Sequence, residues 1–245
     1  MSDYDRNAST PWGNSVARTG TAAEIDAGLR SYMLGIYNHM TLGLAISGLV
    51  ALGIYMIGGP AKAVLYQSPL KWVILLAPLA FVFVLSWRFE KMSYTALLGT
   101  FWAFAAVMGL SLGSIGFIYK TTSIVTALLS TTIAFAGLSL WGYTTKKNLS
   151  GFGNFLMMGL IGLIVASLVN IFLKSPALYF AISGLGVLIF AGLTAWDTQR
   201  LKEEYDYVSH DGELMQKSSV MGALSLYLNF INMFQFILSL TGSKE

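Results

Sequence analysis

The sequence predicts an all-α integral membrane protein, a bundle of seven transmembrane helices with the seventh helix at its centre. Hydrophobic residues make up 55% of the chain and charged residues only 11%, against roughly 25% charged in an ordinary soluble domain. The charged residues separate long uncharged stretches, most of them long enough to cross a bilayer. The last stretch carries several amides, which must be kept away from lipid.

Seven uncharged windows lie between the Asp, Glu, Lys and Arg residues. They cover 31–61, 72–87, 92–119, 121–145, 148–173, 175–196 and 218–243. Because a spanning helix needs about 20 residues, we expect one transmembrane domain over 31–243. Its spans are expected at about 33–57, 70–87, 93–118, 122–143, 154–173, 177–196 and 219–241. Residues 1–30 are polar, without an apolar run, and we expect them to form a cytosolic tail.

The first two spans follow this tail. Asn38 and His39 lie near the start of the first span, and we interpret them as interfacial or capped residues. The second span is the shortest, but Lys71 and Arg88 at its ends can extend their side chains to the membrane surface. Trp72 and Trp87 also lie at its ends, where indole rings favour the headgroup level.

Spans three to six show the small residues typical of membrane helices. The third contains Ala105, Gly109 and Gly113, which indicate close packing against another helix. The fourth ends near Trp141, a further interfacial aromatic residue. The fifth window is uncharged along its whole length. The sixth contains Gly184 and Gly186, which membrane helices accept more readily than soluble helices do. No segment alternates polar and apolar residues as a membrane barrel would.

The seventh span carries a polar stripe of Ser225, Asn229 and Asn232, spaced by four and three residues, with Gln235 and Ser239 beyond it. This spacing places the residues on roughly one helical face. Amides in hydrocarbon need partners, so the stripe must face protein or a wet cavity. Two interpretations remain open, hydrogen bonds that join helices or the lining of a pore.

The orientation follows from the positive residues. The tail and alternate loops after it hold ten Lys and Arg residues, and the other side holds five. Because positive loops stay in the cytoplasm, we expect the N-terminus inside and the C-terminus outside.

Composition and motifs exclude several classes of protein. The chain has no cysteine and two histidines, so thiolate chemistry and a histidine metal centre are not expected. A net charge of +3 does not indicate a nucleic-acid partner. Residues 218–243 contain no lysine for retinal, and the membrane windows offer no pair of aspartates for a protease. We therefore predict that the chain is not an enzyme and has no cofactor.

The acidic residues concentrate after the sixth window. Half of the twelve lie between positions 197 and 213. Most such runs are solvated surfaces, although hard cations such as calcium favour several carboxylate oxygens. Asp197 stands apart because it ends the sixth window, three residues before Arg200. It is either an ordinary charge at the membrane edge or a weak candidate calcium ligand at membrane depth.

Three stretches resemble the Bax inhibitor-1 family, also called the transmembrane Bax inhibitor motif family, and especially its bacterial members. They are ALSLYLNFINMFQFILSLTG (223–242), TAWDTQRLKEE (194–204) and SWRFEKMSYTALLGTFWAFAAVMGLSL (86–112). The resemblance extends over about residues 30–242. It implies seven helices, with a central seventh helix enclosed by the other six, and a location in a bacterial inner (plasma) membrane.

The resemblance also implies a function. Bacterial relatives look like pH-sensitive calcium leak channels, in which aspartates of helices six and seven share a proton and an arginine ending helix two latches the closed state. Asp197 matches the first aspartate and Arg88 the arginine, but position 229 is Asn. Two close carboxylates share a proton because like charges repel, and the amide removes that repulsion. We therefore expect a weakened pH-sensing gate with Asp197 paired to Arg88.

Two functions follow from this reasoning. The first is a calcium or cation leak channel gated by Asp197, Asn229 and Arg88. The alternative is a non-transporting membrane regulator that binds a membrane-anchored ATP-dependent protease or other membrane proteins, because some bacterial relatives look like modulators of such a protease. A regulator of this kind would need 1–30 or 198–217 for its contacts. Asn229 favours this alternative slightly, because a scaffold needs no titratable group there. A small-solute transporter is less favoured, since no inverted repeat is visible.

Overall fold

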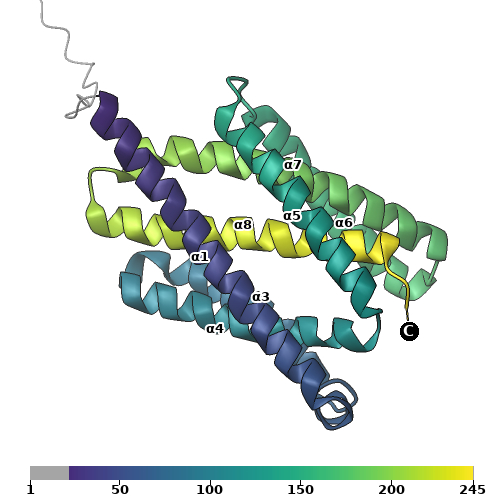
Figure 1. Cartoon of the computed structure of the whole chain (residues 1–245). Helices are drawn as coiled ribbons and strands as arrows, with labels where there is room; N and C mark the ends of the chain where they lie inside the picture. Colours follow the sequence, from purple (N-terminus) through teal and green to yellow (C-terminus); the bar gives the residue numbers. More distant parts are fainter. Residues whose placement is uncertain (1–21, 245) are drawn as a thin grey trace, which may run out of the picture.

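The computed structural model describes residues 22–244, and this part of the chain is a helical bundle (Figure 1). The expected tail, 1–30, lies mostly outside the described residues. The long helices are α1 (Ala22–Ile57), α3 (Leu70–Arg88), α4 (Tyr94–Gly113), α5 (Thr121–Thr144), α6 (Ser150–Leu173), α7 (Pro176–Val208) and α8 (Gly212–Thr241). The short helical turns are α2 (Gly59–Ala61), η1 (Lys62–Tyr66), η2 (Phe89–Lys91) and η3 (Ser114–Phe117). Between residues 22 and 244 extended pairing is limited to one isolated bridge, Tyr119 with Lys244.

The prediction of seven spans is confirmed. Seven of the described helices are long and apolar enough to cross a membrane. Local sequence sets several of their ends: Ser93, Ser175 and Asp211 accept hydrogen bonds from backbone amides in the first turns of α4, α7 and α8. Pro176 follows its cap at the first helical position, where its missing N–H is not needed.

Helix α8 lies at the centre, as its amides predict. It packs against α1, α4, α5 and α7, and Figure 1 shows α1 and α5 crossing over it. Of its most apolar window 56% of the residues are buried, against 11–33% in the other six spans. Its Tyr227 ring is fully buried between Phe101 and Phe104 of α4, with ring centroids 6.0 and 5.4 Å away. The other helices expose their apolar side chains on the outside of the bundle, where lipid would cover them.

The small residues of α4 pack closely against α1, as the sequence predicts. A Cβ atom added to Gly109 would lie 2.7 Å from the backbone oxygen of Ser47, so only glycine permits this approach. Ser47 donates a hydrogen bond to the backbone oxygen of Ala105 at 2.6 Å, and the Tyr227 hydroxyl bonds the same Ser47 oxygen at 2.6 Å. This network joins α1, α4 and α8 on the side of α8 away from α6.

Helices α7 and α8 extend beyond the predicted spans. Helix α7 continues to Val208 and α8 begins at Gly212, whereas the uncharged windows end at 196 and begin at 218. The added turns carry charged residues of the acidic segment, which a helix leaving the bilayer can present to water. Three residues, 209–211, join the two helices, so α7 and α8 form an antiparallel hairpin.

Candidate functional site

The α7–α8 hairpin brings carboxylates of α7 onto serines of α8. Ser225 donates a hydrogen bond to Oδ2 of Asp197 at 2.7 Å, and Ser218 donates one to Oε1 of Glu204 at 2.6 Å. The two carboxylates are seven residues apart along α7, and the two serines are seven residues apart along α8. Antiparallel helices keep such a register because positions seven apart return to nearly the same face.

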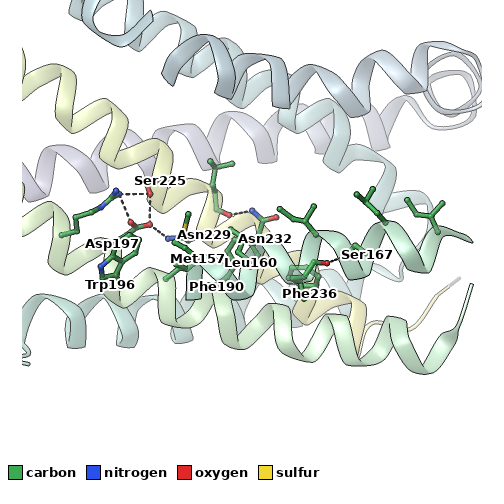
Figure 2. A pocket seen from close by; sticks show the side chains of 17 residues that line it. Met157, Leu160, Ser167, Phe190, Trp196, Asp197, Ser225, Asn229, Asn232 and Phe236 are labelled. Atoms are coloured by element: carbon green, nitrogen blue, oxygen red, sulfur yellow. Dashed lines mark hydrogen bonds and ion pairs between the residues drawn. The ribbon is translucent and has the colours of Figure 1, made fainter. Parts of the chain in front are cut away.

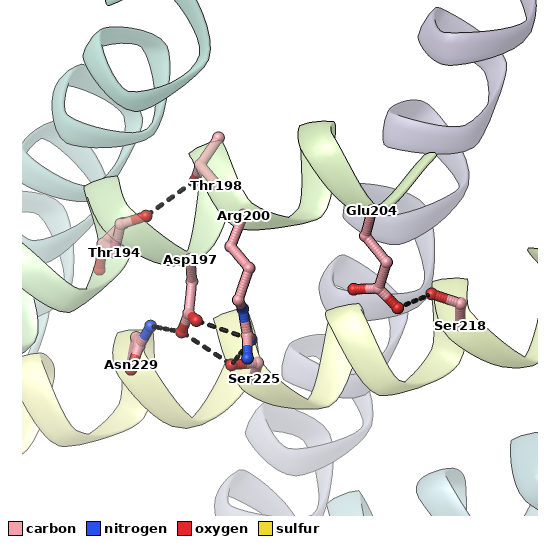
Figure 3. Close-up of polar contacts among 8 residues, drawn as sticks. All are labelled: Thr194, Asp197, Thr198, Arg200, Glu204, Ser218, Ser225 and Asn229. Atoms are coloured by element: carbon pink, nitrogen blue, oxygen red, sulfur yellow. Dashed lines mark hydrogen bonds and ion pairs between the residues drawn. The ribbon is translucent and has the colours of Figure 1, made fainter. Parts of the chain in front are cut away.

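Asp197 is the centre of the candidate site (Figure 2 and Figure 3). Its side chain and that of Asn229 belong to residues that are only 5% exposed. The Asn229 amide donates a hydrogen bond to Oδ2 of Asp197 at 2.7 Å. Two donors from α8 therefore meet one carboxylate oxygen of α7, which leaves the other oxygen for a charged partner.

That partner is Arg200, one turn further along α7. Its Nη2 lies 2.7 Å from Oδ1 of Asp197 and 3.4 Å from the hydroxyl oxygen of Ser225. The guanidinium also lies over the ring of Trp196, 5.1 Å from the centroid. The Arg200 side chain is 46% exposed, so the ion pair has one buried member and one member at the surface.

Arg88 does not take this place. It ends α3 with an exposed side chain, and among the hydrogen bonds and ion pairs of residues 22–244 none joins it to Asp197. Helix α3 packs on α4, whereas Asp197 faces α8 and a groove beside α6. The expected pairing of Asp197 with Arg88 is thus replaced by a local pairing with Arg200.

The polar stripe of α8 divides into separate contacts. Ser225 and Asn229 join the Asp197 cluster, while the Asn232 amide donates to the backbone oxygen of Leu228 at 2.8 Å. The Ser239 hydroxyl bonds Tyr179 of α7 at 2.7 Å, which fits a bond between helices. The interpretation was wrong for Gln235, whose side chain is exposed, because at 3.6 residues per turn it lies about 80° round the helix axis from Ser225.

Two polar connections were missed at the level of sequence. The Tyr32 hydroxyl of α1 bonds the Ser218 oxygen at 2.7 Å, and so extends the Glu204 contact to a third helix. The Ser139 hydroxyl of α5 bonds that of Thr198, next to Asp197, at 3.0 Å. The sequence held a signal for the Ser218–Glu204 contact that Tyr32 extends, because Glu204 lies seven residues after Asp197 and so on nearly the same face of α7. The second joins hydroxyl residues that show no pattern along the chain.

A groove opens beside the Asp197 cluster (Figure 2). Its volume is about 550 Å³ and it lies between α6 and α8, with α7 forming the floor. Its lining is mainly apolar, including Leu160, Ile164 and Phe236, and its polar lining includes Asp197, Arg200, Ser225, Asn229 and Asn232. The candidate site therefore lies at the polar end of a space that continues along the helices.

The site offers little for a resident metal. Within the described residues, no group of three or more His, Asp or Glu side chains lies close enough to hold a metal ion. Calcium takes six to eight oxygen ligands in its usual sites, and Asp197 is a single carboxylate already paired with Arg200. Any cation bound here would be held weakly.

Comparison with known proteins agrees with this architecture. A protein-family model described as "Inhibitor of apoptosis-promoting Bax1" matches residues 29–245. The inner membrane protein YbhL of Escherichia coli (strain K12) is 41% identical, covering 93% of this chain and 98% of its own length. Uncharacterized proteins of Caulobacter vibrioides and Rickettsia prowazekii are 44% and 38% identical, over the full length of both chains in each case. The chain is an integral membrane protein and belongs to the Bax inhibitor-1 family.

Proposed function

We propose that this protein is a cation leak channel that the ion pair of Arg200 with Asp197 holds closed. The observation that carries the proposal is a carboxylate that is 95% buried against the central helix, beside a groove of about 550 Å³. An ionisable residue at membrane depth is by default a functional residue. The carboxylate supplies the negative charge that attracts a cation.

A contribution to folding stability does not by itself explain why Asp197 and Arg200 form an ion pair here. Desolvating a charge costs several kcal/mol, and apolar residues of similar volume often replace a buried ion pair without loss of stability. The cluster also joins α7 and α8, two of the three helices that line the groove, through Ser225 and Asn229. A charged contact placed there is better suited to a position that changes during transport.

The ligand chemistry favours passage of a hard cation over storage. When Arg200 leaves, the oxygens of Asp197, Ser225 and Asn229 could replace part of the water around calcium. One carboxylate binds weakly, and weak binding allows the ion to leave again. The amide at position 229 leaves a single acidic group at the gate, so we expect conduction to depend little on pH near neutrality.

The test is calcium influx into liposomes loaded with a calcium-sensitive dye. We expect influx through the wild type above that of protein-free liposomes, and a loss of most of it in Asp197→Asn. Glu203→Gln is the matched control, because it removes one negative charge from an exposed position of the same helix. Equal influx through Asp197→Asn and the wild type would contradict the proposal, as would a wild type no leakier than empty liposomes.

A second function is favoured by the end of the α7–α8 hairpin. Glu203, Asp211 and Glu213 are exposed there, and the Tyr207 side chain is 82% exposed. Exposed tyrosines beside charges are typical of protein contact surfaces. This surface would suit a regulator that binds a membrane-anchored ATP-dependent protease.

Co-purification with that protease from the host membrane tests the regulator. We expect Tyr207→Ala to weaken the complex, whereas Phe83→Ala, on the lipid-facing surface of α3 and 72% exposed, leaves it unchanged. Failure to co-purify, or an equal loss in both variants, would count against this function.

A further inference from the structure

The groove between α6 and α8 contains amide oxygens that lack donors. The side-chain nitrogens of Asn229 and Asn232 donate to Asp197 and to Leu228, but within residues 22–244 no donor reaches the oxygen of either amide. Every fully buried side-chain oxygen or nitrogen in this part of the chain has a partner, so these two oxygens are not fully buried, and both residues line the groove. An amide oxygen in the hydrocarbon region needs a donor, and for Asn229, which lies beside the polar end of the groove, an occupant of the groove is placed to supply one.

The rest of the groove is shaped for a hydrocarbon chain. Along α6 its lining runs from Met157 to Ile171, about 21 Å at 1.5 Å per residue. Ile164 and Leu168 line it and are 52% and 55% exposed, so this wall is open to lipid. A volume of about 550 Å³ suits one acyl chain better than the two chains of an ordinary phospholipid.

The positively charged side chain of Arg200 lies at the polar end of the groove. The Arg200 guanidinium is 46% exposed and uses one of its nitrogens on Asp197 and Ser225, which leaves other N–H groups for a ligand. It lies over the Trp196 ring and at the predicted cytoplasmic edge of α7, where we expect phospholipid headgroups. Arginine forks match the oxygens of a phosphate.

From these three features we infer that the groove binds a lysophospholipid. Its phosphate contacts Arg200, the free sn-2 hydroxyl of its glycerol backbone donates to the amide oxygen of Asn229, and its single acyl chain lies along α6 past Ile164 and Leu168. A diacyl phospholipid lacks the free hydroxyl at the sn-2 position of the glycerol backbone and has one chain too many. A monoacylglycerol has the hydroxyl groups but lacks the phosphate.

This inference does not depend on ion conduction. The groove, the free oxygens and the exposed guanidinium would hold the same lipid in a channel or in a regulator. Lipid binding is measured without a calcium gradient, so failure of one proposal leaves the other to be judged separately.

The experiment uses lysophosphatidylglycerol that carries a photoreactive diazirine in its acyl chain. The full-length protein in phosphatidylcholine nanodiscs is labelled by light, and the labelled residues are mapped by mass spectrometry. We expect labels on Ile164, Leu168 and Ile171 of α6, well above those on Leu79 and Phe83 of α3. The α3 residues are 67% and 72% exposed, so they report ordinary lipid contact.

Competition and variants define the contacts. We expect unlabelled lysophosphatidylglycerol to compete at least tenfold better than dipalmitoyl phosphatidylglycerol or monopalmitoylglycerol. We expect it to compete about threefold to tenfold better than a 2-deoxy analogue, which lacks only the sn-2 hydroxyl, the effect of one hydrogen bond. Leu168→Trp should fill the groove and reduce labelling severalfold. Ile133→Trp, on the lipid-facing side of α5 and 74% exposed, is the control and should leave labelling unchanged.

Three results would overturn the inference. Equal labelling of α3 and α6 would identify only the lipid that surrounds any membrane protein. Unchanged labelling in Leu168→Trp would place the chain outside the groove. Equal competition by the diacyl lipid, by monopalmitoylglycerol or by the analogue without the hydroxyl would refute recognition of a lysophospholipid.

Discussion

The Arg200→Gln substitution tests the contact that we propose as the latch of the closed channel. It removes the positive charge beside Asp197 and leaves a shorter, neutral side chain that can still form hydrogen bonds. The lost contact is one charged interaction of 2.7 Å between a buried carboxylate and a half-exposed guanidinium. We expect cation influx to rise, because the closed state loses a contact that the open state does not have.

The size of the effect follows from that geometry. A hydrogen bond to a charged group contributes about 1.5 to 3 kcal/mol, and exposure of Arg200 favours the lower end because solvent screens the pair. About 1.4 kcal/mol corresponds to a tenfold change in an equilibrium constant. If the open state is rare in the wild type, its population and the calcium influx should both rise roughly tenfold.

Liposomes loaded with a calcium-sensitive dye give the readout, with protein content matched between samples. Arg200→Lys should fall between the wild type and Arg200→Gln, since it keeps the charge but loses the fork geometry. Arg88→Gln removes an exposed arginine at the end of α3 and should leave influx unchanged. An increase in Arg88→Gln without one in Arg200→Gln would refute our assignment of the latch and restore the one that the family resemblance implies.

Three further predictions concern other parts of the bundle. Asn229→Asp places a second carboxylate against Asp197, so we expect calcium influx to become steeply dependent on pH between pH 6 and 8; profiles identical to the wild type would contradict this. Gly142→Ala should lower the free energy of unfolding in detergent by about 1 to 3 kcal/mol, because its Cβ would lie 2.2 Å from the backbone oxygen of Ala195. Gly137→Ala, on the same helix with nothing within 4 Å, should be neutral or slightly stabilising, and equal losses in the two variants would argue against this packing. Tyr227→Phe removes the hydroxyl contact to Ser47 and should cost about 0.6 to 1.5 kcal/mol in the same unfolding assay, whereas no measurable change would show that this bond contributes little.

The bundle could be predicted because the bilayer constrains sequence strongly. Charges cannot stay in hydrocarbon, so the uncharged windows locate the spans, and amides need protein partners, so Asn229 identifies the central helix. Helix ends are weaker signals, since the polar turns of α7 up to Val208 are indistinguishable from a loop by hydropathy. The same rule therefore predicts the membrane core well and the turns outside it poorly.

The partner of Asp197 was harder to predict. The resemblance to the family pointed to Arg88, from a helix far away in the sequence. Spacing on α7 itself offered Arg200, three residues on, where residues of one helix face each other. The groove depends on how α6 and α8 pack on α7, and no linear pattern contains that information.

The three-residue connection between α7 and α8 limits how this gate can move. Asp211 caps α8 by accepting hydrogen bonds from the backbone amides of Glu213 and Leu214, so the connection has little slack. If one helix slid along the axis of the other, the connection would be stretched and both serine–carboxylate hydrogen bonds would break together. Rolling of α8 about its own axis, or a rotamer change of Arg200, leaves the connection intact, and opening should therefore proceed by torsion.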